Sequence, residues 1–278
     1  MNKIVKTFIN LAKPYENNKK NNNFKLEYIQ SFFSSKNIPF EYIPGQGLIV
    51  NKQEKPRLVC VSHIDLINLF NLEFCTKNNE EDIAFNDLID SMCLEESSIS
   101  VEGICVIHNG FISGALDNTI TNAVALLVCE ELISNGINDI EFFFSEMEEI
   151  GLKGMKNYLN SNLKKSKNTF FVNLDVTNEG FHTHISVEFD KTRMRVLKHL
   201  VAKLNKEHVY FTGQRFCDDI DAVIASNCNG LSFCLPTNGN IHSYKNKAKL
   251  SSLVPYKEGL YEILSTLKFN KNDPYIKI

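Results

Sequence analysis

The chain has 278 residues, a formal net charge of −3 and a hydrophobic fraction of 43%, with 20 phenylalanines. This length suits one large domain or two small ones, and the hydrophobic fraction is sufficient for a substantial core. The near balance of 30 basic and 33 acidic residues argues against a nucleic-acid partner. No apolar stretch reaches the length of a membrane span, and the first residues lack the apolar segment of a signal peptide.

The first fifty residues predict two helices and a strand pair. Residues 2–13 and 24–33 carry apolar residues at helical spacing, and the polar Asn/Lys tract at 17–23 between them predicts a surface loop. Residues 40–50 predict two short strands that are separated by a turn with two glycines.

The next fifty residues contain the first strongly apolar strand, at 57–62. Residues 66–99 mix apolar and acidic residues, and we expect an insertion of small elements at the edge of the fold. Residues 101–113 predict a β-hairpin, because the Asn-Gly pair at 109–110 suits a type I′ turn.

The rest of the chain alternates apolar strands with helices. Such alternation predicts an α/β/α sandwich with a mostly parallel mixed sheet. Neither an internal repeat nor a linker divides the chain, so we expect one catalytic domain over residues 1–278. The expected strands are 140–144, 169–174, 183–189, 208–212 and 230–235, and the expected helices are 120–133, 151–159, 192–204 and 250–267.

The eight cysteines form no CxxC pair, and several lie inside apolar runs. Free cysteine behaves as a small apolar residue, and cytosolic proteins keep their thiols reduced. We therefore expect buried, reduced thiols, a cytoplasmic location and no zinc site that is built from cysteine.

Two adjacent carboxylates, Glu148 and Glu149, stand where the 140–144 strand ends and the chain turns. Like charges side by side repel each other unless a cation or a proton intervenes. The common alternative is a solvated helix start, where acidic residues suit the positive end of the helix dipole. In such sheets, ligands bind beyond the carboxyl ends of the strands. The residues at the ends of the other strands therefore decide between a metal site and a solvated helix start.

Five more polar residues stand at such positions. His63 and Asp65 follow the 57–62 strand, and Asp175 follows the 169–174 strand. Asp117 precedes the 120–133 helix, and His242 follows the last strand, at 230–235. Imidazole and carboxylate groups bind zinc and related divalent ions, and a carboxylate can bridge two ions. As a residue two positions along an extended strand, Asp65 shares a face with His63 and could orient its ring.

The full set predicts two divalent metal ions. Glu149 would join the ligands, and Glu148 would be left free beside the ions as a general base. The donor types favour Zn²⁺, with Co²⁺ or Mn²⁺ as alternatives.

At this point the chain resembles a known family, the co-catalytic dizinc exopeptidases. The resemblance lies in residues 62–65, 115–118, 148–154 and 174–177, together with His242. Within this clan, the chain is most similar to the glutamyl and tetrahedral (TET) aminopeptidases.

The resemblance implies a specific distribution of the ligands. One ion would be bound by His63, Asp117 and Asp175. The other would be bound by Asp117, Glu149 and His242, so that Asp117 bridges the two ions.

The resemblance also implies the catalytic groups. Glu148 would deprotonate the attacking water and pass the proton to the leaving amine, while Asp65 would support His63. The peptide bond between Asp117 and Asn118 would be cis, as in the rest of the clan.

Substrate class stays open at the level of sequence. The resemblance favours an aminopeptidase acting on short peptides. An N-acyl amino-acid deacylase or a dipeptidase of the same clan is the alternative, and a non-catalytic binding relative would require broken metal ligands. Residues 66–113 are a shortened insertion where relatives carry a lid domain, and assembly as a homo-oligomer is compatible with the resemblance.

Two further residues are candidates for substrate binding. Asp221 matches part of the family's Gly-Thr-Asp-Ala stretch and could bind a substrate amine, with a solvated turn as the alternative. His182 could line the substrate cleft, with an ordinary surface position as the alternative.

Overall fold

A computed structural model gives the fold of the chain. The expected helix at 192–204 and the expected insertion at 66–98 lie outside the described residues. The structure describes residues 2–12, 23–65, 99–101, 105–189, 209–212, 218–243 and 245–267.

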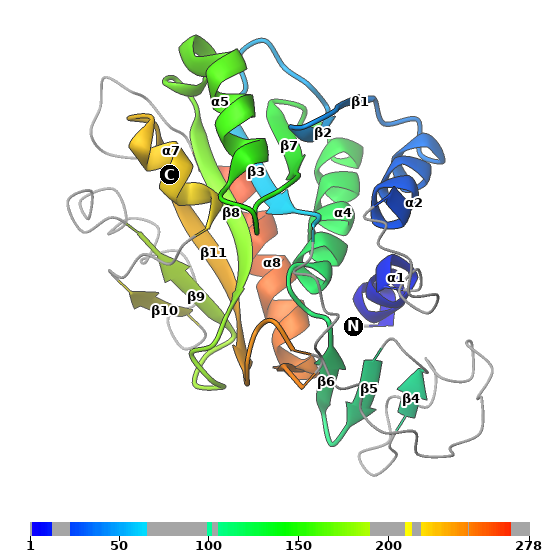
Figure 1. Ribbon diagram of the computed structural model, residues 1–278. Coiled ribbons are helices and arrows are strands. Elements are labelled where there is room, and N and C mark those ends of the chain that lie inside the picture. The colour runs from blue at the N-terminus through cyan, green and yellow to red at the C-terminus, as the bar shows by residue number, and fades with distance from the viewer. Residues whose placement is uncertain are drawn as a thin grey trace.

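Four parallel strands form the centre of the sheet (Figure 1). Their order is β7 (Ile140–Ser145), β3 (Leu58–His63), β8 (Phe170–Thr177) and β11 (Asn229–Asn238). All three neighbouring pairs run parallel. These strands are almost completely buried, which explains their continuous apolar sequences, because a parallel sheet is covered on both faces.

The outer strands pair mainly in the antiparallel sense. Beyond β7 lies β2, followed by β1; beyond β11 lie β12, β6, β5 and β4 in that order. Strand β9 pairs antiparallel with β11 and parallel with β10. The bounds are β1 (Phe40–Ile43), β2 (Gly47–Val50), β4 (Ile99–Val101), β5 (Cys105–His108), β6 (Phe111–Gly114), β9 (Ile185–Glu188), β10 (Val209–Thr212) and β12 (Lys247–Lys249).

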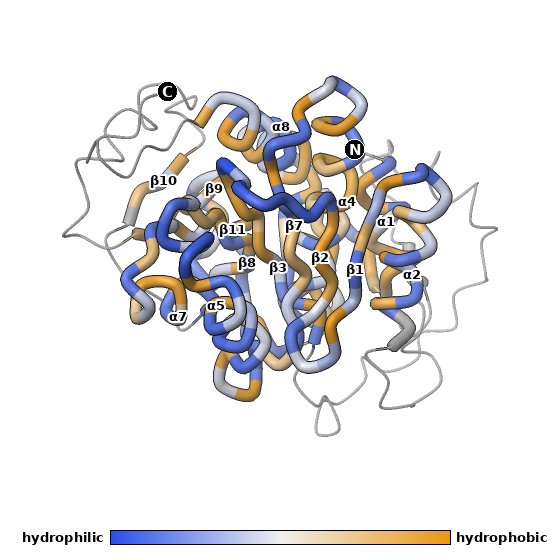
Figure 2. The backbone as a smooth tube through the Cα atoms, turned by 90° about the horizontal axis from the view of Figure 1, so that it is seen from above, coloured by the Kyte–Doolittle hydropathy of each residue, from blue (hydrophilic) through white to orange (hydrophobic). Residues whose placement is uncertain are grey.

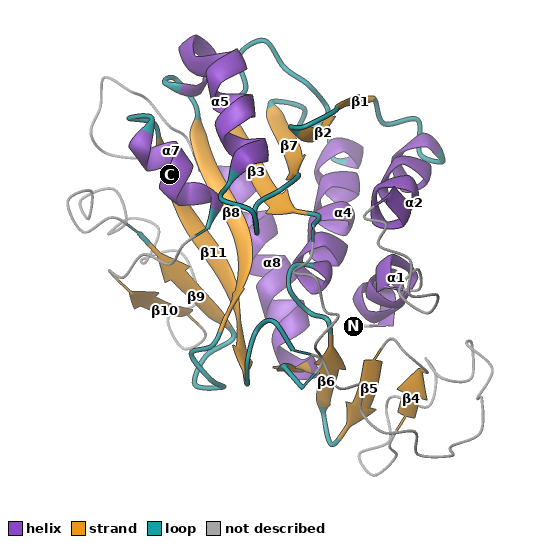
Figure 3. Cartoon of the chain, in the orientation of Figure 1, coloured by secondary structure: helices purple, strands orange, loops and turns teal. Residues whose placement is uncertain are grey.

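Helices cover both faces of the central sheet (Figures 2 and 3). Residues of one face pack with α1, α2, α4 and α8, and residues of the other face pack with α5 and α7. Neighbouring strand residues alternate between these two layers: Phe142 and Phe144 face the first, and Phe143 faces the second. The bounds are α1 (Asn2–Ala12), α2 (Asn23–Ser34), α4 (Thr119–Ser134), α5 (Lys153–Ser166), α7 (Asp219–Ala225) and α8 (Leu250–Thr266).

This architecture confirms the expected three-layer α/β/α fold with a mixed sheet. The hairpin of β5 and β6 is also confirmed, and the turn residues Asn109 and Gly110 both have positive φ, as a type I′ turn requires. The five described cysteines are buried, as expected. Among the described helices, none combines the length and apolar composition that a membrane crossing requires.

Four details of the elements differ from the sequence-based expectations. Strand β8 continues past 174 to Thr177, and β11 continues through Pro236 to Asn238, because the two strands pair in register over this stretch. The sequence analysis missed β12, which has only three residues, and α7, whose Asp-rich start suggested a turn.

The order of the central strands creates a place for a site. Strand β3 lies between β7 and β8, and the chain passes from β7 through α5 to β8 on the other side of β3. In open α/β sheets, ligands bind outside the carboxyl ends of the strands at such a reversal.

Candidate metal centre

His63 is the last residue of β3 and provides the first side chain of the site. Its ring is buried, and both ring nitrogens face carboxylates. Nε2 lies 3.1 Å from Oδ1 of Asp117, and Nδ1 lies 3.6 Å from Oδ1 of Asp65. The backbone carbonyl of His63 accepts a hydrogen bond from the side-chain amide of Asn122 at 2.9 Å, which ties β3 to α4.

Asp65 connects His63 to the loop after β7. Its Oδ1 accepts a hydrogen bond from the backbone N–H of Glu148, and its Oδ2 accepts one from the N–H of Glu149, both at 3.1 Å. Asp65 is only 3% exposed, so water does not compete for these bonds. This buried carboxylate therefore fixes the positions of both glutamates, while Nδ1 of His63 lies 3.2 Å from the backbone carbonyl oxygen of Asp65.

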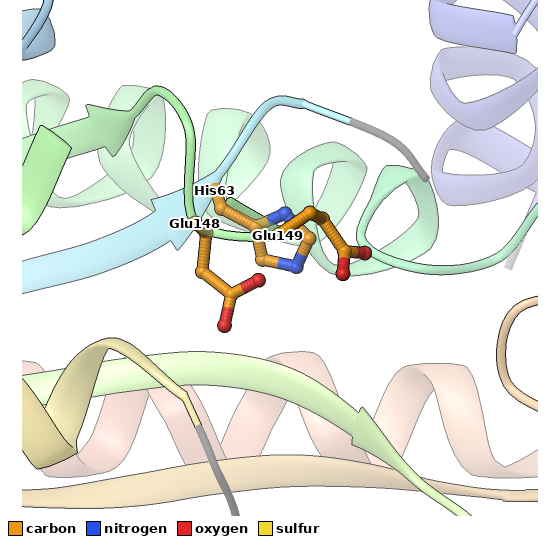
Figure 4. A group of neighbouring side chains, drawn as sticks. All are labelled: His63, Glu148 and Glu149. Atoms are coloured by element: carbon orange, nitrogen blue, oxygen red, sulfur yellow. The ribbon is translucent and has the colours of Figure 1, made fainter. Parts of the chain in front are cut away.

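Glu148 and Glu149 extend from the loop between β7 and α5 (Figure 4). Met147 and Leu152, on either side, have left-handed backbone conformations. The carbonyl of Glu148 accepts a bond from the N–H of Leu152 at 2.8 Å, so the loop closes on itself before α5 begins. This tight turn directs both carboxylates toward His63.

Asp117 lies immediately before α4, and its peptide bond to Asn118 is cis. The side-chain amide of Asn118 donates a hydrogen bond to the carbonyl of Leu174 at 2.6 Å. That bond joins the start of α4 to β8 beside Asp175, which stands within β8 rather than after its end.

His242 lies in the loop between β11 and β12 and is half-buried. Its Nε2 lies 3.3 Å from Oδ2 of Asp117 and 3.6 Å from Oε2 of Glu149. Asp117 therefore directs one oxygen to His63 and the other to His242.

The predicted residues come together as three overlapping groups. Within each group, the candidate ligand atoms all lie within 4.8 Å of one another. Asp117 belongs to two of the groups, and so do His63 and Glu149. The groups are His63 with Asp117 and Asp175, Asp117 with Glu149 and His242, and His63 with Glu148 and Glu149.

The two histidines hold one carboxylate in its charged form. Burial would raise the Asp117 pKa, but hydrogen bonds from His242 and His63 outweigh it and lower this pKa well below its usual value. Burial opposes protonation of His63, yet its bonds to Asp117 and Asp65 raise the His63 pKa well above 6.5.

The other carboxylates are pushed toward their neutral forms. Burial raises the pKa of Glu148 to about 8. Burial, and then the charge of Asp117, raise the pKa values of Glu149 and Asp175. The site thus holds more negative charge than it can accommodate without protons or cations.

The donor set and its electrostatics fit divalent cations. Imidazole nitrogens and carboxylate oxygens are the ligands of catalytic zinc sites, and the buried, mutually repelling carboxylates would gain from a cation. Asp65 supports His63 in the way that second carboxylates orient metal-bound imidazoles.

A second pair of acids lies behind this cluster and was not expected there. Asp218 caps α7 by accepting a bond from the N–H of Ile220, and Asp219 accepts a bond from the Ser145 hydroxyl. Both are buried, and burial raises the pKa of Asp218 to about 6 and that of Asp219 to about 7. The capping position of Asp218 before an apolar Ile-x-x-Val-Ile pattern was the available signal for α7.

The two candidate substrate-binding residues stand apart from the three groups. Asp221 lies in the first turn of α7 with a partly exposed side chain, so the solvated-turn alternative was incorrect about the secondary structure. His182 is exposed and precedes β9.

Fold and site together describe a three-layer α/β protein with a cluster of histidines and carboxylates that could hold metal ions at the carboxyl end of its central strands. The sequence profile of peptidase family M28 matches residues 48–253 of the chain, well over half of its length. The chain therefore belongs to peptidase family M28. No curated protein matches the chain by sequence.

Solved structures with a similar fold include several peptidases. TET1 peptidase of Pyrococcus horikoshii, which can assemble into a tetrahedron or a large octahedral shell, matches with a TM-score of 0.62 and 12% identity over 92% of this chain and 99% of its own. An aminopeptidase of the archaeon Desulfurococcus kamchatkensis matches with a TM-score of 0.63 and 11% identity over 94% of both chains. Yeast aminopeptidase 1 matches with a TM-score of 0.61 and 11% identity over 95% of this chain and 97% of its own.

Proposed function

We propose that the chain is an aminopeptidase that removes N-terminal residues from short peptides with the help of two divalent metal ions, zinc being the first candidate. The observation that carries this proposal is the position of Asp117, whose two oxygens face His63 and His242. One carboxylate thereby joins two groups of three ligands, which is what a two-metal hydrolase requires.

The ligands divide between the ions as follows in this proposal. His63, Asp117 and Asp175 would bind one ion, and Asp117, Glu149 and His242 would bind the other. Bound metal ions supply a nucleophile from water at neutral pH and polarise the scissile carbonyl group.

Glu148 is the general base and acid of the proposed reaction. It belongs to a group with His63 and Glu149, yet the two three-ligand groups above are complete without it. Its carboxylate would accept a proton from the attacking water and deliver it to the leaving amine. Its carboxylate oxygen lies within 4.8 Å of the candidate ligand atoms of His63 and Glu149, and this proximity supports the role.

The free N-terminus of the substrate would meet an acidic site. We include Asp221, on the partly exposed first turn of α7, as a further contact for this amine, and His182 as a residue of the cleft rim.

Substituting Glu148→Gln tests the assignment of the base. We expect turnover of zinc-loaded protein to fall at least about 100-fold, because the amide cannot accept the proton. Circular dichroism and metal content should match the wild type. Glu41→Gln on the exposed strand β1, where Glu41 pairs with Lys52, is the matched control and should keep full activity.

Matched peptides with free and acetylated N-termini test the substrate class, with mass spectrometry as readout. Stepwise loss of residues from the free peptides alone, abolished by a chelator, is the expected result. Release of the acyl group instead would contradict the proposal and indicate a deacylase.

A further inference from the structure

Lys25 is a buried lysine in the first turn of α2. Its side chain is 1% exposed, and within the described part of the chain its Nζ has no hydrogen-bond partner. A buried ammonium group without a partner costs several kcal/mol, so lysine is almost never found in this state. Packing alone gives no reason for a lysine at this position.

Lys165, a partly buried lysine whose side chain is 13% exposed, offers a comparison. Its Nζ lies 2.7 Å from Oε2 of Glu141 and faces the ring of Tyr158 at 5.8 Å. Lys165 thus has a carboxylate and an aromatic ring as partners for its charge, whereas within the described residues the Nζ of Lys25 has no hydrogen-bond partner.

The charges that act on Lys25 belong to the candidate metal centre. Burial lowers its pKa to about 8, and the charges of Asp65, Asp117 and Glu149 oppose this effect. Those three carboxylates come from the end of β3, the start of α4 and the loop after β7. Lys25 is therefore a cation within electrostatic range of the centre, and within the described residues its Nζ makes no hydrogen bond to any side chain there.

The charge of the centre explains what such a cation can do. Five carboxylates meet there, whereas two divalent ions provide four positive charges. Lys25 adds a positive charge to these surroundings and so lowers the negative potential at the ligand groups. The five carboxylates are those of Asp65, Asp117, Glu148, Glu149 and Asp175.

We propose that Lys25 is the counter-charge of the metal centre: it weakens the hold of the carboxylates on the two ions and keeps these ions strongly electrophilic. Lys25 acts through Asp65, Asp117 and Glu149 and does not touch the substrate, so it is a positioning residue. This inference rests on the proposed two-metal function. It accounts for a buried charge that the fold itself does not need.

Metal affinity tests the inference without any substrate. Zinc alone is titrated into metal-free protein at pH 6.5 in competition with a chromogenic chelator. In Lys25→Met, whose side chain fills a similar space, we expect zinc to bind about tenfold more tightly, because a neighbouring positive charge is gone. Lys25→Arg retains the charge and should bind zinc like the wild type.

Lys165→Met is the matched control, since it removes a largely buried lysine that belongs to none of the ligand groups. Its zinc affinity should equal that of the wild type. Damage to the site would loosen the metal, so a gain in affinity distinguishes loss of a counter-charge from loss of structure.

Steady-state kinetics adds a second readout. In Lys25→Met, kcat should fall while KM for a neutral peptide stays constant, because Lys25 does not contact the substrate. Unchanged or weaker zinc binding in Lys25→Met would overturn the inference while leaving the proposed function intact. A wild-type protein that binds no zinc would overturn both.

Discussion

Asp65 connects three residues of the site, although it belongs to neither of the two proposed groups of metal ligands. It faces Nδ1 of His63 and accepts the N–H groups of Glu148 and Glu149. Burial would raise its pKa, but the bonds from His63 and from both N–H groups lower it, so the carboxylate is charged. The proposed ligands His63 and Glu149 and the proposed base Glu148 thus all contact this one side chain.

Asp65→Asn should weaken zinc binding by roughly 10–100-fold, as losses of supporting carboxylates do. The amide has only one acceptor oxygen, so its NH₂ group would face one of the two backbone N–H groups. Competition with a chelator measures the change. Asp139→Asn, at a surface pair with Arg57, should leave the affinity unchanged, and an equal loss in both variants would contradict the role of Asp65.

Asp219 makes the stability of the metal-free protein depend on pH. Its pKa is raised from 3.8 to about 7, so the folded state holds a proton that the unfolded chain releases. This contribution is complete below pH 3.8 and is lost as the pH rises through 7. The difference between the two pKa values corresponds to about 4 kcal/mol.

Asp219→Asn removes this titration. Relative to the wild type, the variant should gain about 4 kcal/mol in free energy of unfolding between pH 4 and pH 8, by urea denaturation with chelator present. Asp139→Asn should shift in the opposite direction, because the bond from Arg57 lowers the Asp139 pKa. A constant difference over this range would contradict burial of the Asp219 carboxyl group.

At the scale of elements, the loop after β7 depends on the β1–β2 hairpin. The carboxylate of Glu146 accepts bonds from the Tyr42 hydroxyl at 2.8 Å and from the N–H of Gly45 at 3.2 Å. The backbone also fits closely: a Cβ on Gly154 would lie 2.1 Å from the carbonyl oxygen of Glu146 and 2.5 Å from that of Gln46. Hairpin, loop and helix α5 therefore form one support for the two glutamates.

Gly154→Ala should move this loop, because both obstructing atoms belong to the backbone. We expect a loss of roughly 2 kcal/mol in stability, as in other overpacked sites, together with weaker zinc binding. Gly136→Ala is the matched control: Gly136 has φ +77°, but open space around it. That variant should lose about 1 kcal/mol for its left-handed backbone and no zinc affinity.

Central strands and strand-end residues were the most predictable parts of the structure. The 57–62 and 140–144 segments are apolar throughout because both faces are covered, and His63 stands where such a strand ends. Helix α7 was missed because its seven residues start with acids. Lys25 was missed although it shares a helix face with Ile29 and Phe33, where a lysine is a visible anomaly.

For the whole molecule, the five proposed ligands come from segments that are far apart in sequence and meet only when the sheet is complete. Ions bound to this set would stabilise the folded state alone. With zinc at 100 times its dissociation constant, each site should add about 2.7 kcal/mol, or several degrees in Tm. Differential scanning calorimetry with zinc and then with chelator measures this change, and His242→Ala should lose much of it.

The short pairing between β11 and β12 determines where the loop that carries His242 begins and ends. Among the described residues, two pairs, Thr237 with Ala248 and Asn238 with Lys247, connect β11 to β12 and thus to β6, β5 and β4. His242 lies in the loop that closes this short link. The distances from His242 to Asp117 and Glu149 therefore depend on how β12 is seated against the end of β11, and a substitution that shifts this pairing is expected to alter the candidate metal centre.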